Sequence, residues 1–193
     1  EPGWEINLIE KPTKQRPDVV HYPYFDLFFL TLPTAPKPFV VTIHDVIPLI
    51  YPREYRPGIR GTLKYQLQRF KLKTTSAVIT DSDRSKKDIS THLGVPIKKI
   101  HKVYLAGNPN LTKQSSDMVR EVKAKYGLPK QYLLYIGDVN YNKNLPRLIE
   151  VYDELKKAPP LVLLGRSMKN TSIPEGWAIR SMIDKHNLQD RVI

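Results

Sequence analysis

The chain has no cysteine among its 193 residues, so disulfide bonds and thiolate metal sites are excluded. No apolar run is long enough to span a bilayer, and the first residues lack the basic and apolar segments of a signal peptide. The glycine-rich phosphate fingerprints G-x-G-x-x-G and G-x-x-x-x-G-K-[ST] are also missing. These absences exclude disulfide-rich and membrane-spanning classes and the two commonest nucleotide-binding motifs.

Metal-binding and nucleophile patterns are missing as well. The five histidines show no metal-ligand spacing and there is no H-E-x-x-H, so we expect no metal and no other cofactor. No G-x-S-x-G places a serine as a nucleophile. The sequence therefore gives no sign of metal-assisted or serine-based hydrolysis.

Positive charge is what the chain has in excess. Lysine and arginine number 31 against 19 acidic residues, a formal net charge of +12, which favours anionic partners such as nucleotide phosphates or acidic lipids. The periodicity predicts a helix over 58–73 with an apolar face and an opposite basic face. We interpret the basic face as a solvated surface, although peripheral contact with an anionic membrane is open. Aromatic residues are not interleaved to stack bases, so no nucleic acid is expected. The apolar face comprises Ile59, Leu63, Leu67 and Phe70. The basic face comprises Arg60, Lys64, Arg69, Lys71 and Lys73.

Predicted strands and helices alternate along the chain. This order predicts an α/β fold with parallel sheets and helices on both faces. The polar segment 110–117 predicts a boundary between two domains, 1–112 and 113–193. Segment 46–51 is interpreted as an apolar loop. The expected strands are 18–21, 39–43, 77–80, 101–105, 133–136, 161–164 and 190–193, and the further helices are 83–93, 118–126, 145–155 and 175–186.

The stretch 132–150 is the most informative unit. An apolar run over 133–136 is typical of a short buried strand, and Gly137 ends it before a polar loop. Lys143 follows, then Asn144 as the expected N-cap of a helix with Pro146 in its first turn. A lysine beside a helix N-terminus at a strand's carboxyl end suits a phosphate or diphosphate. The alternative is an ordinary capped βα unit with a solvated lysine, which the spacing alone favours.

Three further places carry candidate chemistry. His44 and Asp45 directly follow a predicted strand, where a histidine can bind sugar hydroxyls and an aspartate can orient it. The alternative is a histidine satisfied by a loop carbonyl and an aspartate that caps a turn. Ser82 is placed to cap a helix, or to help bind an anion there. Gly165 is either a close-approach glycine at a cleft or a plain strand terminator.

Taken in order, several segments resemble the family 4 glycosyltransferases of GT-B fold. The resemblance covers about 18–193 and implies two Rossmann-like domains, each incomplete. Residues 1–112 would be the second half of the N-terminal acceptor-side domain, and 113–193 the first half of the C-terminal donor domain. The segments are VVTIHDVIPL, AVITDSDRSKKDI, HLGVPIKKIHKVYLAGNP, YLLYIGDVNYNKNLPRLIEVY and LVLLG.

The resemblance implies transfer of a sugar from a GDP- or UDP-sugar to a hydroxyl acceptor, with retention of configuration and without a metal. The acceptor would be a sugar or a lipid-linked sugar in polysaccharide, lipopolysaccharide or glycolipid synthesis. We expect a cytoplasmic protein, with peripheral contact at the inner face of the membrane left open. His44 and Asp45 are the expected catalytic residues, with His44 reaching the donor sugar and Lys143 contacting the diphosphate. The expected donor-binding residues are Ser82, Gly137, Asn142, Lys143, Asn144 and Gly165.

The chain also departs from the family pattern. Asn142 and Asp138 stand where many relatives carry arginine, and the paired glutamates of the donor domain are missing. We therefore expect the middle part of such an enzyme, inactive alone. Two alternatives remain at this point: a GT-B nucleotide-sugar epimerase, and a non-catalytic basic module that binds an anionic membrane or nucleic acid.

Overall fold

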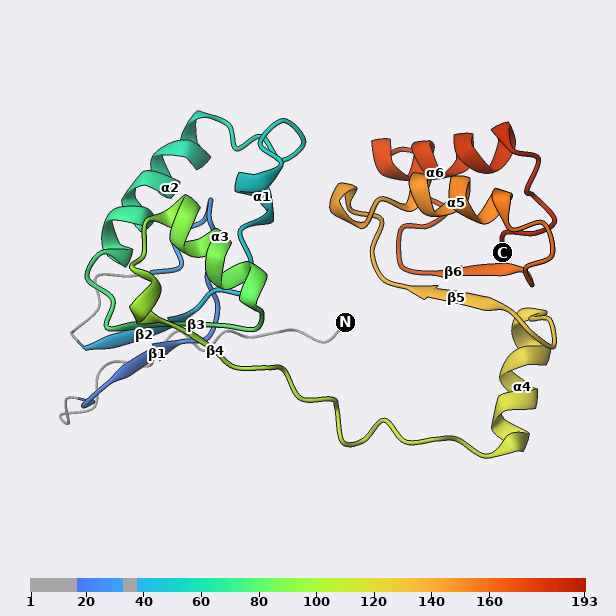
Figure 1. Ribbon diagram of the computed structural model, residues 1–193, viewed down its shortest axis with the longest axis horizontal. Helices are drawn as coiled ribbons and strands as arrows, with labels where there is room; N and C mark the ends of the chain where they lie inside the picture. The colour runs from blue at the N-terminus through green and yellow to red at the C-terminus, as the bar shows by residue number, and fades with distance from the viewer. Residues whose placement is uncertain (1–16, 33–37) are drawn as a thin grey trace. The chain divides into compact units, whose positions relative to one another are not determined.

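The computed structural model describes residues 17–32 and 38–193, which belong to two compact units (Figure 1). The first unit ends at Ala106 and the second starts at Gly107, a few residues before the predicted boundary. Each unit is an α/β structure whose strands pair in parallel. The predicted parallel α/β class is therefore confirmed.

The first unit has a four-stranded parallel sheet in the order β1-β2-β3-β4. Its strands have the same order in the sequence and in the sheet, so each crossover connects two neighbouring parallel strands. The register pairs Thr42 with Ile79 and Thr80 with Lys102, which brings the carboxyl ends of three strands level. The strands are β1 (Val20–Tyr22), β2 (Phe39–Thr42), β3 (Ala77–Thr80) and β4 (Ile100–Lys102).

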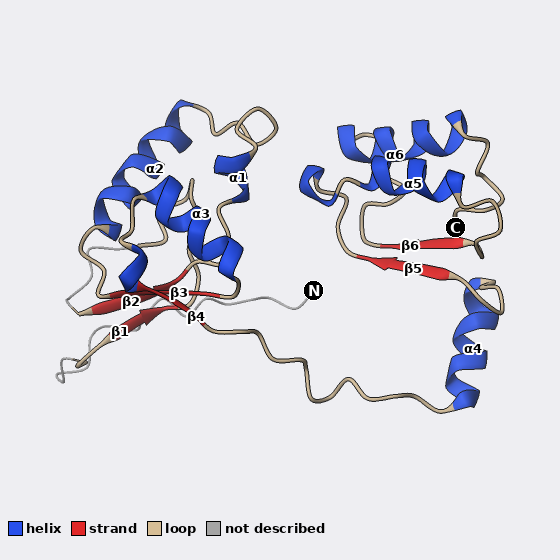
Figure 2. Ribbon diagram, viewed as in Figure 1, coloured by secondary structure: helices blue, strands red, loops and turns tan. Residues whose placement is uncertain are grey.

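The described helices of the first unit lie on one face of this sheet (Figure 2). We expected helices on both faces, and the part of the chain that the structure describes supplies only one layer. Segment 46–51, interpreted as a loop, contains a single helical turn with a proline at its start. The helices are α1 (Ile47–Ile50), α2 (Ile59–Leu72) and α3 (Asp83–Leu93), followed by the 3-10 turn η1 (Ile97–Lys99).

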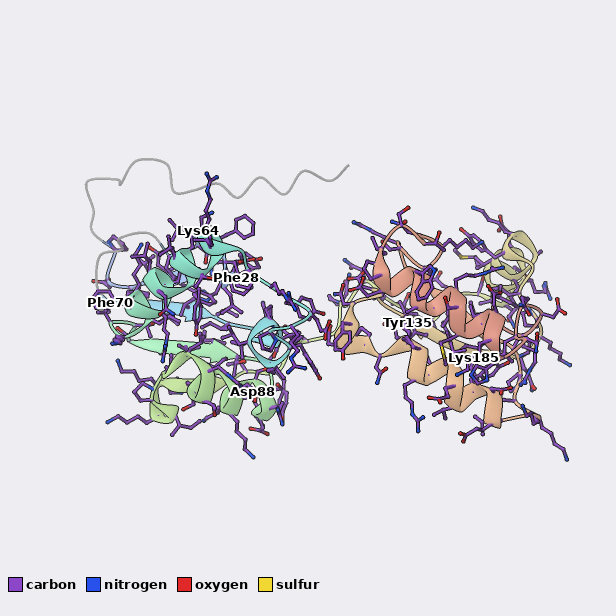
Figure 3. All side chains as sticks on the ribbon, turned by 90° about the horizontal axis from the view of Figure 1, so that it is seen from above. Phe28, Lys64, Phe70, Asp88, Tyr135 and Lys185 are labelled. Atoms are coloured by element: carbon purple, nitrogen blue, oxygen red, sulfur yellow. The ribbon has the colours of Figure 1, made fainter. Side chains whose placement is uncertain are left out.

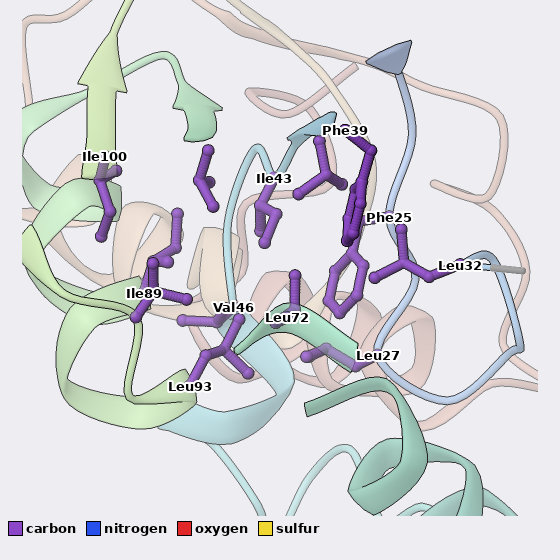
Figure 4. Close-up of a cluster of buried hydrophobic side chains, with 13 residues drawn as sticks. Phe25, Leu27, Leu32, Phe39, Ile43, Val46, Leu72, Ile89, Leu93 and Ile100 are labelled. Atoms are coloured by element: carbon purple, nitrogen blue, oxygen red, sulfur yellow. The ribbon is translucent and has the colours of Figure 1, made fainter. Parts of the chain in front are cut away.

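The core of the first unit lies between the sheet and the helices (Figure 4). Strand β2 alternates, with Phe39 and Val41 buried and the residues between them half-buried, as expected for a strand covered mainly on one face. The buried side chains are Phe25, Leu27, Leu32, Phe39, Val41, Ile43, Val46, Leu72, Val78, Ile89, Leu93, Val95 and Ile100.

The second unit has a two-stranded parallel sheet, to which the end of the chain adds one isolated bridge between Leu161 and Val192. The strand expected over 190–193 is thus reduced to that bridge. Helices α5 and α6 lie together on one side of this sheet (Figure 1), and Ile149, Tyr152 and Ile179 join them in a second core. The elements are α4 (Ser116–Tyr126), β5 (Leu133–Ile136), the 3-10 turn η2 (Tyr141–Lys143), α5 (Leu145–Glu154), β6 (Leu161–Leu164) and α6 (Pro174–Lys185).

The prediction that 133–136 forms a buried strand is right about the strand and wrong about burial. Leu134 and Ile136 are 48% and 69% exposed, because α5 and α6 cover only one face of the strand pair. Tyr135 points to the covered face and packs against the core. Leu155, expected on the apolar face of the helix, is also exposed because α5 ends at Glu154.

No helix among the described residues is long and apolar enough to cross a membrane.

Candidate functional site

The first candidate site lies at the carboxyl edge of the four-stranded sheet. His44 follows β2 and Asp81 follows β3, and the parallel register places them side by side. His44 Nδ1 lies 3.1 Å from Asp81 Oδ2, with the histidine side chain 47% exposed and the aspartate 23%. Because a carboxylate only accepts hydrogen bonds, this contact places a proton on Nδ1, and in the neutral ring Nε2 is then an acceptor.

Asp45 does not orient His44, contrary to the expectation. Its Oδ1 accepts the backbone N–H of Ile47 at 3.0 Å, which fixes the turn into α1. The carboxylate beside His44 comes instead from Asp81, which sequence reasoning considered only with Ser82, as the end of a strand or part of an anion site at a helix N-terminus. The sequence shows His44 and Asp81 each just after a predicted strand, but that these two strands are neighbours is known only from the structure.

Ser82 caps α3, as one of its two interpretations predicted. Its Oγ accepts the N–H of Ser85 at 3.0 Å and donates to the Ser85 hydroxyl at 2.9 Å. Ser82 has extended backbone angles, and Gly94 ends the same helix in the left-handed conformation. Capping accounts for both polar contacts of Ser82, so its assignment to donor binding stays a prediction.

Charged and polar groups continue along this edge after β4. Lys102 Nζ donates to Asp83 Oδ2 at 2.5 Å and lies 2.7 Å from the Tyr104 hydroxyl. The hydrogen bond to Lys102 is the main cause that lowers the pKa of Asp83, and the same bond raises the pKa of Lys102. At the opposite end of the strand order, His21 Nε2 on β1 lies 2.9 Å from Thr42 Oγ1 on β2. The edge thus presents hydrogen-bonding groups from all four strands, where open α/β sheets bind ligands.

The second candidate site lies at the carboxyl edge of β5 and β6, where two glycines meet. The Gly137 N–H donates to the Leu164 carbonyl at 3.0 Å, and a Cβ on Gly165 would overlap the carbonyl oxygen of Gly137. Gly165 is therefore a close-approach glycine, but its neighbour is the chain's own backbone. Gly137 has a φ of +157°, and a Cβ there would lie 2.8 Å from the Tyr135 hydroxyl. Side chains are thus kept away from both strand ends.

The loop after Gly137 is anchored to the core of the second unit by one buried side chain and one hydrogen bond. Val139 is buried in the core of the second unit. Tyr135 Oη donates to the Asp138 carbonyl at 2.8 Å, and burial is the main cause that raises the pKa of this tyrosine. The chain then forms the turn η2, which ends at Lys143. Lys143 is exposed, and within residues 17–32 and 38–193 no carboxylate pairs with its ammonium group. Asn142, beside it, is half-buried.

The start of α5 differs from the prediction in its chemistry. Asn144 precedes the helix, as expected, but it has left-handed backbone angles (φ 50°, ψ 45°) and its side chain makes no capping bond. Pro146 has no N–H, and the N–H groups of Arg147 and Leu148 both donate to the Asn144 carbonyl. The helix therefore offers fewer free amides than an ordinary helix N-terminus.

Arg166 is a residue that sequence reasoning missed. It directly follows Gly165 and is exposed. Because Ile136 pairs with Leu164, Arg166 leaves β6 at the position where Asp138 leaves β5. The end of β6 thus carries a second cation at the edge of the sheet after which Lys143 follows β5.

No group of three potential metal ligands occurs among the residues that the structure describes.

Comparison with known proteins adds to this geometry. The model of Glycosyltransferase Family 4 matches residues 4–108, more than half of the chain. The serotype-specific mannosyltransferase WbdA of Escherichia coli is 24% identical over 162 residues, which are 76% of this chain and 20% of WbdA. The O-antigen chain mannosyltransferase B of Escherichia coli is 30% identical over 131 residues, 65% of this chain and 34% of that protein.

A solved structure shares the fold. The crystal structure of Anabaena Alr3699/HepE in complex with UDP and glucose matches with a TM-score of 0.63 at 16% identity, over 81% of this chain and 40% of HepE. The chain thus spans well under half the length of each of these proteins. The fold prediction, α/β of GT-B type with part of each domain present, is confirmed.

Proposed function

Because the chain belongs to Glycosyltransferase Family 4, we propose that it is the middle part of a glycosyltransferase that uses a nucleotide-sugar donor in polysaccharide synthesis. The two Escherichia coli relatives are named as mannosyltransferases, one of them for the O-antigen chain, and HepE was solved with UDP and glucose. These names support a GDP- or UDP-sugar as donor and the hydroxyl of a growing glycan as acceptor.

The arrangement at the ends of β5 and β6 carries this proposal. Gly137 and Gly165 keep side chains off both strand ends, and the anchored loop presents Lys143 beside the start of α5. A diphosphate lying over the glycines would meet this ammonium group, with Arg166 at the same edge. Positive charge placed there stabilises the negative charge that develops on a departing nucleoside diphosphate. In this account the cations are lysine and arginine side chains, and no metal takes part.

His44 would serve the donor sugar. With Nδ1–H directed to Asp81, the Nε2 lone pair can accept a hydrogen bond from a sugar hydroxyl. In the reaction the bond between the anomeric carbon and the phosphate oxygen breaks and a bond to the acceptor oxygen forms. The acceptor proton passes to the departing diphosphate, so no side chain is required as the base. We propose retention of anomeric configuration.

The epimerase alternative has no observation in its favour, because the relatives are named for mannosyl transfer. A test that separates the two uses the full-length protein, GDP-mannose or UDP-glucose, and an O-antigen-type oligosaccharide acceptor. We expect a longer glycan whose new linkage has the donor's anomeric configuration by NMR, with activity that persists in EDTA. Inversion on the donor without transfer would contradict the proposal, and loss of transfer in EDTA would contradict its metal-free form.

A further inference from the structure

Helix α2 turns its apolar stripe outward. Ile59, Leu63, Leu67 and Phe70 lie on one face of the helix and are between 55% and 85% exposed. The buried positions, Gln68 and Leu72, lie on the opposite face. The sequence pattern predicted a solvated basic face, and the structure exposes the apolar face as well. A contiguous exposed apolar patch of this kind marks an interaction site.

Hydrogen bonds fix the helix in this orientation. Gln68 is fully buried, and its Oε1 accepts the N–H groups of Thr31 at 3.0 Å and Leu32 at 2.9 Å. Its Nε2 donates to the carbonyls of Asp26 and Phe29. Rotating α2 to bury the leucines would leave these polar groups without partners, which is costly in a protein interior. The outward stripe is therefore built into the unit.

Cations border the stripe on both sides. At 100° per residue, Arg60 and Lys64 lie along one border and Arg69 and Lys73 along the other, and the helix contains no acidic residue. Lys71 also falls on the first border, but its Nζ donates to the Leu32 carbonyl at 2.5 Å, so it is not counted among the cations offered to a partner. Lys73 Nζ lies 5.8 Å from the Phe70 ring centroid, and a hollow of about 300 Å³ is lined by Gln66, Arg69, Phe70 and Lys73. Phe29 is also exposed, and Lys64 Nζ lies 5.2 Å from its ring centroid (Figure 3 labels Lys64 and Phe70).

We propose that α2 docks on the surface of an anionic lipid bilayer, lying in the interface with its apolar stripe among the headgroups. The stripe supplies apolar area, and the bordering lysines and arginines bind anionic headgroups. A second copy of the chain fits less well, because a symmetric contact through this face would oppose two sets of cations. The net charge of +12 adds long-range attraction to the same surface. The inference goes beyond the proposed function, since docking requires no sugar transfer.

The test is cosedimentation of the full-length protein with vesicles. We expect binding to mixed phosphatidylcholine–phosphatidylglycerol vesicles that weakens with salt, and much less binding to phosphatidylcholine alone. The double variant Leu67→Gln/Lys73→Gln should lower partitioning by more than about tenfold, since each cation and each inserted apolar side chain contributes. The matched control Leu111→Gln/Lys113→Gln removes the same groups from an exposed segment and should bind as the wild type does.

Four outcomes would overturn the proposal. These are equal partitioning of the α2 variant and the control, equal binding to neutral vesicles, a dimer that the α2 variant breaks without any vesicle binding, and a lower Tm of the α2 variant than of the control. The last would mean that another part of the protein covers the stripe. Nucleotide-sugar affinity, measured by calorimetry on the same variants, should stay unchanged, so failure of docking is separate from failure of the proposed transferase.

Discussion

At the level of single residues, the contact between His44 and Asp81 decides what the first site can do. A free imidazole exchanges between two tautomers, whereas a carboxylate 3.1 Å from Nδ1 selects the one with Nε2 unprotonated. Under the proposed function, Asp81 would be a positioning residue that acts on the donor sugar through His44. The neighbouring Asp45 has a different task, because it holds the backbone N–H of Ile47.

Replacing Asp81 by asparagine should remove the preference of His44 for the tautomer protonated on Nδ1. In the full-length enzyme we expect kcat/KM for transfer to fall. The loss corresponds to a rise of about 1.5–3 kcal/mol in activation free energy, the range for a hydrogen bond to a charged group. The 15N chemical shifts of His44 should change from an Nδ1–H pattern to a mixture. If Asp81→Asn keeps both the wild-type shifts and kcat/KM, Asp81 does not position the histidine.

Gly165 offers a test of the second site's architecture that does not depend on activity. An added Cβ would overlap the Gly137 carbonyl, so one strand end must shift. Overpacking of this kind costs about 1–3 kcal/mol, and Gly165→Ala should lower the free energy of unfolding by that amount. The control Gly107→Ala has open space around the new methyl group and should leave stability close to wild type. Equal denaturation midpoints for the two variants would rule out the close approach.

At the level of helices and strands, the sequence predicts the elements well and their exposure poorly. Strands 77–80, 133–136 and 161–164 begin and end where the apolar runs predict, and helix 58–73 is right to within a residue at each end. Local propensity and caps suffice for that. Which face is buried depends on distant partners: Gln68 is held by the segment around Asp26 and Thr31, and no periodicity records that contact. The same holds for Asp81 beside His44, which needs the strand order.

Helices α5 and α6 are linked by a charged contact that predicts a pH dependence. Asp153 on α5 accepts from Lys156 at 2.7 Å and lies 2.8 Å from His186 Nδ1, just after α6. The hydrogen bond to Lys156, followed by that to His186, lowers the pKa of Asp153 below its usual 3.8. A lowered folded-state pKa contributes stability above the unfolded-state pKa, and that stability is lost as the pH falls through the folded-state value.

We therefore expect the thermal stability of the wild type to fall as the pH drops below about 4. The variant Asp153→Asn should be less stable at neutral pH and should lose less on acidification. Asp190→Asn, which removes an exposed carboxylate that forms no ion pair with any residue the structure describes, should follow the wild-type curve. Parallel curves for wild type and Asp153→Asn, followed by circular dichroism, would show that the pair contributes nothing to folding.

At the level of the whole molecule, each unit presents a candidate site of the same kind, at the carboxyl edge of its parallel strands. The first carries His44 and Asp81 at the carboxyl ends of its strands, and the second carries the two glycines, Lys143 and Arg166. Parallel strands with capped helices place such groups at one edge without any special motif, which is why sequence patterns alone could not separate a site from an ordinary βα unit. The family match raises the functional interpretation above that alternative.

Donor binding is the central claim, and Lys143 is the residue on which it depends most. The direct measurement is calorimetric titration of the full-length protein with GDP-mannose and UDP-glucose, comparing Lys143→Ala with Lys157→Ala. Lys157 is another exposed lysine, beyond the other end of α5. We predict that Lys143→Ala weakens binding of the preferred donor by about 1.5–3 kcal/mol, roughly tenfold to a hundredfold in Kd, while Lys157→Ala leaves it unchanged. Unchanged donor affinity in Lys143→Ala, or no binding of either nucleotide-sugar by the wild type, would contradict the account.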